Sequence, residues 1–241
     1  MRLDAVRRAL DAELAAARAR RQGEPPRVLD VGGGTGVLAV PLASAGCSVT
    51  VVEPNPNALA TLHRRAEEAG VSARITAVQG DSDALGSLVA SAAFDVALAH
   101  GLLEVVEEPK NTVAAMAEAV VPGGAVSVVV SNRYAAVLHR ALAGRLTDAR
   151  DLLDDPAGQL PGEYLLRRFD TEGLGRILVD AGLTVELVQG VGVLADVVPG
   201  AVLELNAGAA EALADLELRV ATVAPLRDVA TRLHAIARRP A

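Results

Sequence analysis

The chain has 241 residues, a length that suits one α/β domain, and 51% of its residues are hydrophobic, which is enough for a sizeable core. Its net charge of −7 argues against a broad nucleic-acid-binding face, because such faces need clustered cations, and we expect no binding to DNA. The single cysteine, Cys47, excludes an internal disulfide and fits a cytoplasmic protein, and the lack of a run of about 18 uncharged apolar residues predicts no membrane-spanning helix.

Helix and strand signals alternate from the N-terminus onward. Apolar residues at helical spacing predict a helix over residues 1–21, which the Gly-Glu-Pro-Pro run at 23–26 ends. Short apolar runs between turn residues predict strands at Val28–Val31, Ser48–Val52, Ala73–Val78, Phe94–Ala99, Ala125–Val130, Leu183–Val188 and Thr231–Arg238. Between them, the pattern predicts helices at Gly36–Ala45, Ala58–Ala69, Thr112–Ala119, Thr171–Ala181 and Ala207–Val223, and a turn at Val121–Gly124.

This alternation predicts an α/β fold with a Rossmann-like, seven-stranded, doubly wound sheet whose last strand is antiparallel. We expect one domain over residues 1–241. Residues 133–170 break the alternation with an amphipathic run at Ala135–Leu142 and a polar stretch, and they predict a small cap inserted above the functional site. The apolar run Val191–Val198 is expected to form a loop under this cap.

The stretch VLDVGGGTG at 28–36 predicts a ligand site at the end of the first strand. An apolar run ends in an acid, four glycines follow within five residues, and a helix can begin, which outlines strand, tight turn and helix. Glycines permit positive φ and let a ligand lie against the backbone. The spacing at Gly32, Gly34 and Gly36 lacks the third glycine of the dinucleotide fingerprint, since residue 37 is Val, and no Lys-Ser/Thr pair follows to make a Walker phosphate loop.

These residues resemble motif I of the class I S-adenosylmethionine (SAM) methyltransferases, D/E-x-G-x-G-x-G, with Asp30 in the acid position. The resemblance implies the class I fold, SAM as cofactor, S-adenosylhomocysteine (SAH) as product, and no metal. Glu53 ends the second strand, where nucleotide-binding α/β folds hydrogen-bond ribose hydroxyls. The methyltransferase pattern places an acid against the adenine after the third strand, which points to Asp81 with Ser82 beside it, while Asp83 is expected to cap the short helix that follows.

A closer similarity, covering most of the chain, is to the bacterial tRNA 5-carboxymethoxyuridine methyltransferases. It is carried by the glycine loop, HGLLEVVEEP at 100–109, VPGG at 121–124, Asn132, VLHRALAGRL at 137–146 and TRLHAIARRP at 231–240. The similarity implies that Arg2 meets the SAM carboxylate, and because the family has a longer N-terminal arm, we expect that arm to be shortened or missing here. The implied cofactor-binding set is Arg2, Asp30, Gly32, Gly33, Gly34, Glu53, Pro54, Asp81, Ser82, His100 and Gly101.

His100 follows the fourth strand, whose carboxyl end faces the methyl group in the class I fold, and it is the candidate catalytic residue. Two roles are open: a general base for a hydroxyl or amine acceptor, or a side chain that only packs on SAM or hydrogen-bonds to it. Glu104 would orient His100 if both lie on one helical turn. The candidate acceptor-binding residues are Asn132, Tyr134 and His139.

Three functions follow from these patterns, for a protein expected to be a monomer or a homodimer. The first is methylation of the carboxylate of a modified tRNA wobble uridine, for which the candidate RNA-binding cations are Arg133, Arg140, Arg145, Arg167, Arg168, Arg238 and Arg239. The second is methyl transfer to a small carboxylate or hydroxyl metabolite, which the acidic balance and the apolar cap favour. The third is non-catalytic SAM binding, against which the intact motif I argues.

Overall fold

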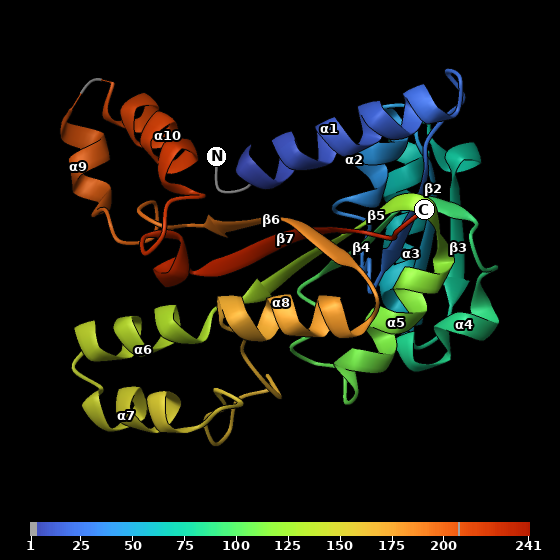
Figure 1. Ribbon diagram of the computed structural model, residues 1–241. Helices are drawn as coiled ribbons and strands as arrows, with labels where there is room; N and C mark the ends of the chain where they lie inside the picture. Colours follow the sequence, from blue (N-terminus) through green and yellow to red (C-terminus); the bar gives the residue numbers. More distant parts are fainter. Residues whose placement is uncertain (1–3, 207) are drawn as a thin grey trace.

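The computed structural model, which describes residues 4–206 and 208–241, is built on one seven-stranded sheet (Figure 1). The strand order is β3-β2-β1-β4-β5-β7-β6. The strands are β1 (Arg27–Val31), β2 (Ser48–Glu53), β3 (Ile75–Gln79), β4 (Phe94–His100), β5 (Val120–Ser131), β6 (Thr184–Val191) and β7 (Arg232–Arg238). Strands β1 to β5 are parallel, and β7 runs antiparallel to both β5 and β6. The predicted sheet with an antiparallel last strand is confirmed.

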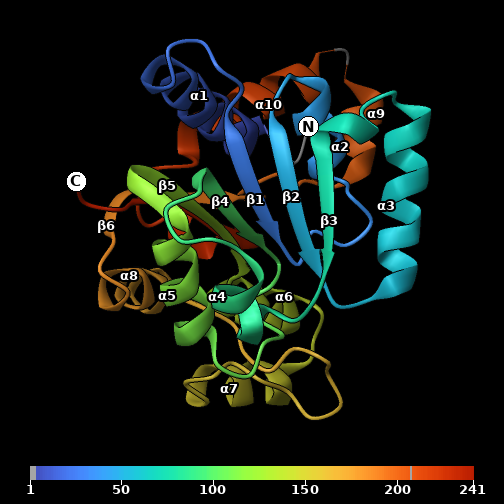
Figure 2. The same cartoon turned by 90° about the vertical axis from the view of Figure 1, so that its right-hand side faces the viewer.

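Helices cover both faces of the sheet, as Figure 2 shows. One face carries α1 (Asp4–Arg20), α2 (Ala39–Ser44) and α3 (Pro56–Glu68), and the other carries α4 (Leu85–Leu88), α5 (Pro109–Ala119) and α8 (Thr171–Asp180). Each central strand supplies apolar side chains to both layers, because successive side chains point to opposite faces. In β1, for example, Val28 belongs to the core under α1–α3, and Leu29 belongs to the core under α5 and α8. This two-sided burial is why these strands read as continuous apolar runs.

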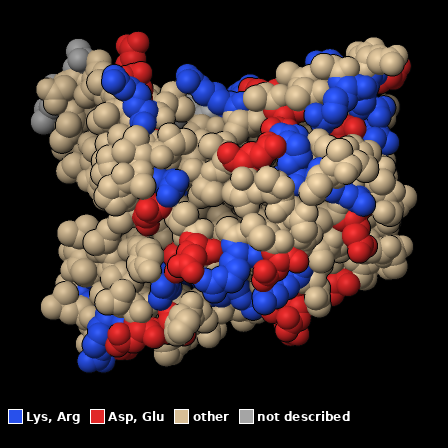
Figure 3. Space-filling view, viewed as in Figure 1, with Lys and Arg blue, Asp and Glu red and all other residues tan. Residues whose placement is uncertain are grey.

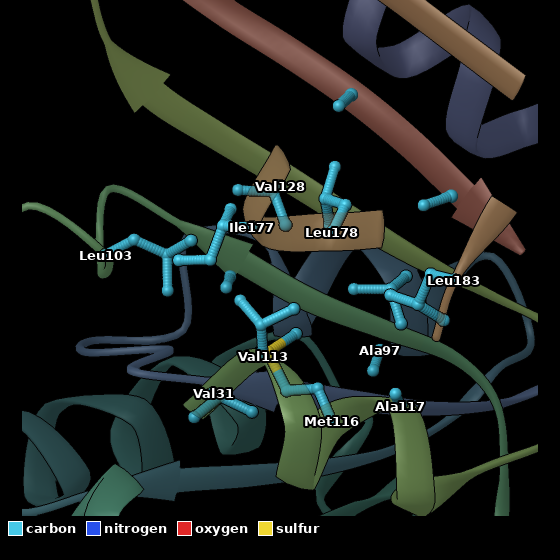
Figure 4. Close-up of a cluster of buried hydrophobic side chains, with 14 of the residues drawn as sticks. Val31, Ala97, Leu103, Val113, Met116, Ala117, Val128, Ile177, Leu178 and Leu183 are labelled. Atoms are coloured by element: carbon cyan, nitrogen blue, oxygen red, sulfur yellow. The ribbon is translucent and has the colours of Figure 1, made fainter. Parts of the chain in front are cut away.

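The core under α5 and α8 is drawn in Figure 4. Val113 and Met116 of α5 and Leu178 of α8 are fully buried against the sheet. The small Ala97 of β4 belongs to the same cluster (Figure 4). This packing fixes the positions at which the parallel strands end, and these ends carry the functional site.

Two helical additions extend beyond the sheet at the end where β4 and β5 finish. The first comprises α6 (Arg133–Leu142), α7 (Leu146–Asp154) and an irregular segment up to residue 170. The second, α9 (Gly200–Leu205) and α10 (Ala209–Val220), lies between β6 and β7 on the opposite side of the sheet (Figure 1). Helix α10 lies within the helix that the sequence predicts over Ala207–Val223, of which Ala207 is outside the described residues, and α9 was not predicted.

Other local expectations are corrected by the structure. Val193 packs on Val220 and Ala230, so the 191–198 segment lies against α10 rather than under the first addition. The helix after the glycine loop is only α2, since residues 34–38 form turns. The predicted turn at 121–124 lies within β5, where the register with β4 shifts.

Three single-turn 3-10 helices complete the described chain, η1 (Ser72–Arg74), η2 (Ser82–Ala84) and η3 (Arg227–Val229). No described helix is long and apolar enough to cross a membrane.

Candidate functional site

The glycine loop follows β1, and a side chain at either of two of its glycines would be crowded. Gly32 has a φ of +69°, and a Cβ on it would lie 2.8 Å from Cδ1 of Leu102. A Cβ on Gly33 would lie 2.6 Å from Oδ2 of Asp30, whose carboxyl group is buried beneath the loop. This Oδ2 has no hydrogen-bond partner within the described chain, and burial, reinforced by the charge of Glu53, raises the pKa of Asp30 to about 7. The loop therefore presents bare backbone above an acid that is readily protonated.

Glu53 fixes the loop to the end of β2. Its Oε2 accepts a hydrogen bond of 3.0 Å from the backbone N–H of Gly34, and its Oε1 accepts one of 3.0 Å from the N–H of Asn55. Each carboxylate oxygen can accept a second hydrogen bond. Glu53 thus holds the turn in place and retains acceptor capacity toward a ligand.

A cavity of about 370 Å³ lies beside the loop on the β2–β3 side of the sheet. Gly32, Pro54, Asp81 and Ser82 line it. Oδ1 of Asp81 accepts hydrogen bonds from the Ser82 hydroxyl and from the backbone N–H of Asp83, both at 3.2 Å. Asp81, and not Asp83 as expected, is therefore the residue that caps η2.

A second cavity, of about 360 Å³, lies on the β4–β5 side and also has Gly32 in its lining. Besides Asp30 and the glycines of the loop, its lining includes His100, Gly101, Glu104, Ser131, Tyr164 and Arg232. The two cavities meet at Gly32, between β1 and β4, where the order of the parallel strands reverses. Open α/β sheets bind their ligands at this switch point.

His100 belongs to a buried chain of polar side chains that crosses four adjacent strands. Its Nε2 lies 2.8 Å from Oγ of Ser127 on β5, and this oxygen lies 2.9 Å from Nε2 of His234 on β7. Nδ1 of His234 lies 2.7 Å from Nε2 of Gln189 on β6. The antiparallel register places Gln189 directly opposite His234, so all four side chains point to the face of the sheet under α1.

This chain fixes the proton positions of both histidines. The Gln189 amide nitrogen can only donate, so Nδ1 of His234 accepts and Nε2 of His234 carries the proton. That proton is donated to Ser127, whose own hydroxyl proton is donated to Nε2 of His100. His100 then carries its proton on Nδ1, a nitrogen that has no partner in the described parts of the chain.

Burial holds both histidines in the neutral form. Burial, with a smaller contribution from the charge of Arg232, lowers the pKa of His100 to about 4. Burial, with a smaller contribution from His100, lowers the pKa of His234 to about 3. At neutral pH neither imidazole is charged.

Glu104 does not orient His100, which corrects the sequence-based expectation. Its Oε1 accepts a hydrogen bond of 2.7 Å from the backbone N–H of Ser131, at the end of β5. Its backbone carbonyl accepts from the N–H groups of Leu166 and Arg167, so residue 104 also anchors the segment that carries Tyr164. Glu104 lines the same cavity as His100, but through a separate set of contacts.

Two of the candidate acceptor-binding residues, Tyr134 and His139, lie on α6 and the third, Asn132, caps it; none of them is in the described lining of the His100 cavity. Asn132 caps α6 through its Oδ1, and its Nδ2 donates to the carbonyls of Asp228 and Ala230, so both ends of its amide are bound within the fold. Tyr134 stacks on the Arg133 guanidinium. His139 lies in the last turn of α6. Arg2 lies outside the described residues.

Ser127, Gln189, His234 and Arg232 were not identified from the sequence. The available signal was a polar residue at an inward-facing position of an otherwise apolar strand, as in VSVVV at 126–130 and LHAIA at 233–237. No cluster of three or more His, Cys, Asp or Glu side chains placed to hold a metal ion occurs within residues 4–206 and 208–241.

Comparisons with known proteins show the family of the chain. The model of a family described as a methyltransferase domain matches residues 3–188. A ubiquinone biosynthesis O-methyltransferase of Methylocella silvestris is 36% identical over 117 residues, 48% of this chain and 43% of the relative. A tRNA 5-carboxymethoxyuridine methyltransferase of Escherichia coli K12 is 28% identical over 118 residues, 49% of this chain and 45% of the relative. The matched region thus spans less than half the length of these two relatives.

A solved structure confirms the fold. The S-adenosylmethionine-dependent methyltransferase of Mesorhizobium loti superposes with a TM-score of 0.63 and 19% identity, covering 98% of each chain. The family match covers more than half of the present sequence, and the described chain has the corresponding sheet with a glycine loop at its switch point. The chain therefore belongs to the methyltransferase domain family.

Proposed function

We propose that this protein transfers a methyl group from SAM to a small-molecule acceptor held in the His100 cavity. SAM supplies an electrophilic methyl group on a sulfonium centre, so the protein has to bind both reactants, align them and exclude water. The observation that supports a small acceptor most directly is that the arginines needed for RNA binding are held by partners within the fold.

The residues at the β1–β3 edge fit the cofactor. Gly32 faces both cavities, and the conflict between a Cβ and Leu102 leaves its backbone as the surface on which a ligand can lie. Glu53 has acceptor capacity for ribose hydroxyls. Oδ2 of Asp81 has no hydrogen-bond partner within the described chain, so it can accept a hydrogen bond from the adenine amine. In this assignment Gly33 and Asp30 lie next to the methionine part, and Pro54 and Ser82 next to the adenine.

The candidate RNA-binding arginines form ion pairs or donate to backbone carbonyls. Arg133 pairs with Asp170, Arg140 and Arg168 with Glu163, Arg145 with Asp148, and Arg238 with Glu13 and Glu186, while Arg167 donates to Leu103 and Glu107, and Arg239 to Glu118 and Val120. Figure 3 shows cations and anions interleaved over one face of the molecule. A phosphate backbone would have to displace these partners, which removes most of the electrostatic gain of RNA binding.

His100 takes the role of a fixed hydrogen-bond donor rather than a general base. Its Nε2 accepts from Ser127, and its Nδ1 carries the proton, so no lone pair of the ring is available to an acceptor. Because its pKa is lowered to about 4, the ring stays neutral and does not repel a sulfonium charge nearby. The Ser127–His234–Gln189 chain keeps this orientation without help from a ligand.

The second candidate acceptor is a modified tRNA uridine, favoured by the similarity to the E. coli protein that carries that name. Incubation with radiolabelled SAM and either bulk tRNA or the low-molecular-mass fraction of a cell extract separates the two. We expect label in the low-mass fraction, no label in tRNA, and no inhibition by added tRNA. Label in tRNA would overturn the small-acceptor proposal, and SAH binding without transfer to either fraction would favour non-catalytic SAM binding.

A further inference from the structure

Besides Asp30 beneath the glycine loop, whose Oδ2 also has no hydrogen-bond partner in the described chain, the His100 cavity is lined by two further groups with unpaired atoms, Glu104 and Arg232. Glu104 is only 3% exposed; its Oε1 accepts from Ser131, but its Oε2 is buried with no hydrogen-bond partner within the described chain. Arg232 is exposed at the same cavity, and across residues 4–206 and 208–241 its guanidinium has neither an ion pair nor a hydrogen bond. The two groups do not pair with each other.

The topology brings the two groups to one edge of the sheet. Ser131, whose N–H holds Glu104, lies opposite Arg232 in the β5–β7 register. Both charges therefore lie on the β4–β5–β7 side of the switch point, whereas Glu53, Asp81 and the cavity that Asp81 lines lie on the β2–β3 side. This separation places Glu104 and Arg232 at the acceptor and away from the nucleotide part of the cofactor.

An orphaned carboxylate oxygen is expensive to bury, and folded proteins rarely keep one unless a ligand satisfies it. Oε2 can accept a hydrogen bond from an O–H or N–H group but repels another carboxylate. The guanidinium of Arg232 suits a planar anion such as a carboxylate. The remaining lining includes apolar side chains, among them Val37, Leu38 and Leu165, together with the exposed ring of Tyr164.

We infer that the acceptor is a hydroxy acid with an apolar or aromatic body, whose hydroxyl group meets Glu104 and whose acid group meets Arg232. This inference rests on the proposed function. Of the two groups on a small metabolite that could receive the methyl group, a carboxylate or a hydroxyl, it selects the hydroxyl. A carboxylate nucleophile has no proton to offer Oε2 and would face a like charge, so the hydroxyl oxygen is the methylated atom.

The proposed step is balanced. As the oxygen–methyl bond forms, the acceptor hydroxyl gives its proton to Oε2 of Glu104. The electron pair of the broken sulfur–methyl bond stays on sulfur, which leaves neutral SAH, a methyl ether and a protonated Glu104 that returns its proton to water. His100 takes no proton in this step, because its Nε2 is occupied by Ser127.

The substitution Glu104→Gln tests the role of Oε2 separately from the structural role of Oε1. Glutamine retains an oxygen that can accept from the Ser131 N–H, so the structural contact survives, and it replaces Oε2 by a donor. The probes are para-hydroxybenzoate, benzoate, which lacks the hydroxyl, and para-hydroxybenzamide, which lacks the charge. Calorimetry measures their binding to the SAH complex.

We expect the wild-type SAH complex to bind para-hydroxybenzoate about tenfold or more tightly than either analogue, since each analogue lacks one charge-assisted hydrogen bond. Glu104→Gln should remove the preference over benzoate only. Arg232→Gln should remove the preference over the benzamide only. Arg20→Gln, an exposed arginine at the end of α1, is the matched control and should change neither preference.

Equal binding of the three probes by wild type, or no binding of any, would overturn the inference. Weaker SAH binding in Glu104→Gln or Arg232→Gln would also overturn it, because the side chain would then meet the ammonium or carboxylate group of the cofactor. These failures are distinct from failure of the proposed function, which would appear as no SAH binding by the wild type.

Discussion

Replacing His234 by Gln should change how the stability of the protein depends on pH. His234 is fully buried between Ser127 and Gln189, and its folded-state pKa is lowered to about 3, mainly by burial. In the unfolded chain its pKa returns to the ordinary value of about 6.5. Between these two values the unfolded chain binds a proton that the folded chain does not, so the free energy of unfolding falls as the pH falls.

The magnitude follows from the unfolded pKa. At about pH 5, some 1.5 units below 6.5, the histidine costs the folded state about 2 kcal/mol relative to about pH 8. Glutamine has no such proton. The stability advantage of wild type over His234→Gln should therefore shrink by about 2 kcal/mol from pH 8 to pH 5. Asp30, whose raised pKa of about 7 acts in the opposite direction, is present in both proteins and cancels in the difference.

The assay is urea unfolding of both proteins at about pH 8, 6.5 and 5, followed by circular dichroism, with stability differences taken from midpoints at equal slopes. The substitution His63→Gln is the control, because His63 lies exposed on α3, and it should show no comparable trend. A difference between wild type and His234→Gln that does not change with pH would refute a buried, neutral His234 in the folded protein.

Three further predictions concern the loop and its surroundings. Gly33→Ala should lower the free energy of unfolding by about 1–3 kcal/mol in urea titrations and weaken SAH binding, because the new Cβ would overlap Oδ2 of Asp30; unchanged values would contradict the described loop. Glu53→Ala should weaken SAH by about 1–3 kcal/mol in calorimetry, the cost of a lost charged hydrogen bond, and an unaltered affinity would remove Glu53 from the site. Asn132→Ala should destabilise the fold by about 1–3 kcal/mol through loss of the α6 cap and of two bonds to η3 and Ala230, with SAH affinity unchanged; weaker SAH binding would speak against its structural role.

The sequence predicted the sheet well because its signals are local. The run from Val28 to Gly36 contains strand, acid and turn within nine consecutive residues, and the buried parallel strands are recognisable as apolar runs. Helix α10 falls within the predicted helix over Ala207–Val223, whereas α9 was missed for the same reason. Helix α9 spans only Gly200–Leu205, too short for a 3.6-residue period to emerge.

The polar chain beside His100 could not be predicted because it is made by tertiary register. Ser127 and His234 are 107 residues apart and meet only because β7 lies antiparallel to β5. Asn132 is a different case. It directly precedes an amphipathic run, which is the position of a helix cap, and that local signal was available to distinguish a structural residue from a ligand-binding one.

The central claim, a SAM site at the switch point of the sheet, is tested most directly by calorimetric titration of the full chain with SAH and, separately, with NAD. We expect one SAH per chain with micromolar affinity, displacement by SAM, and no heat from NAD. A folded protein that gives no heat with SAH, or that binds NAD in its place, would contradict the assignment of Gly32, Glu53 and Asp81 to the cofactor.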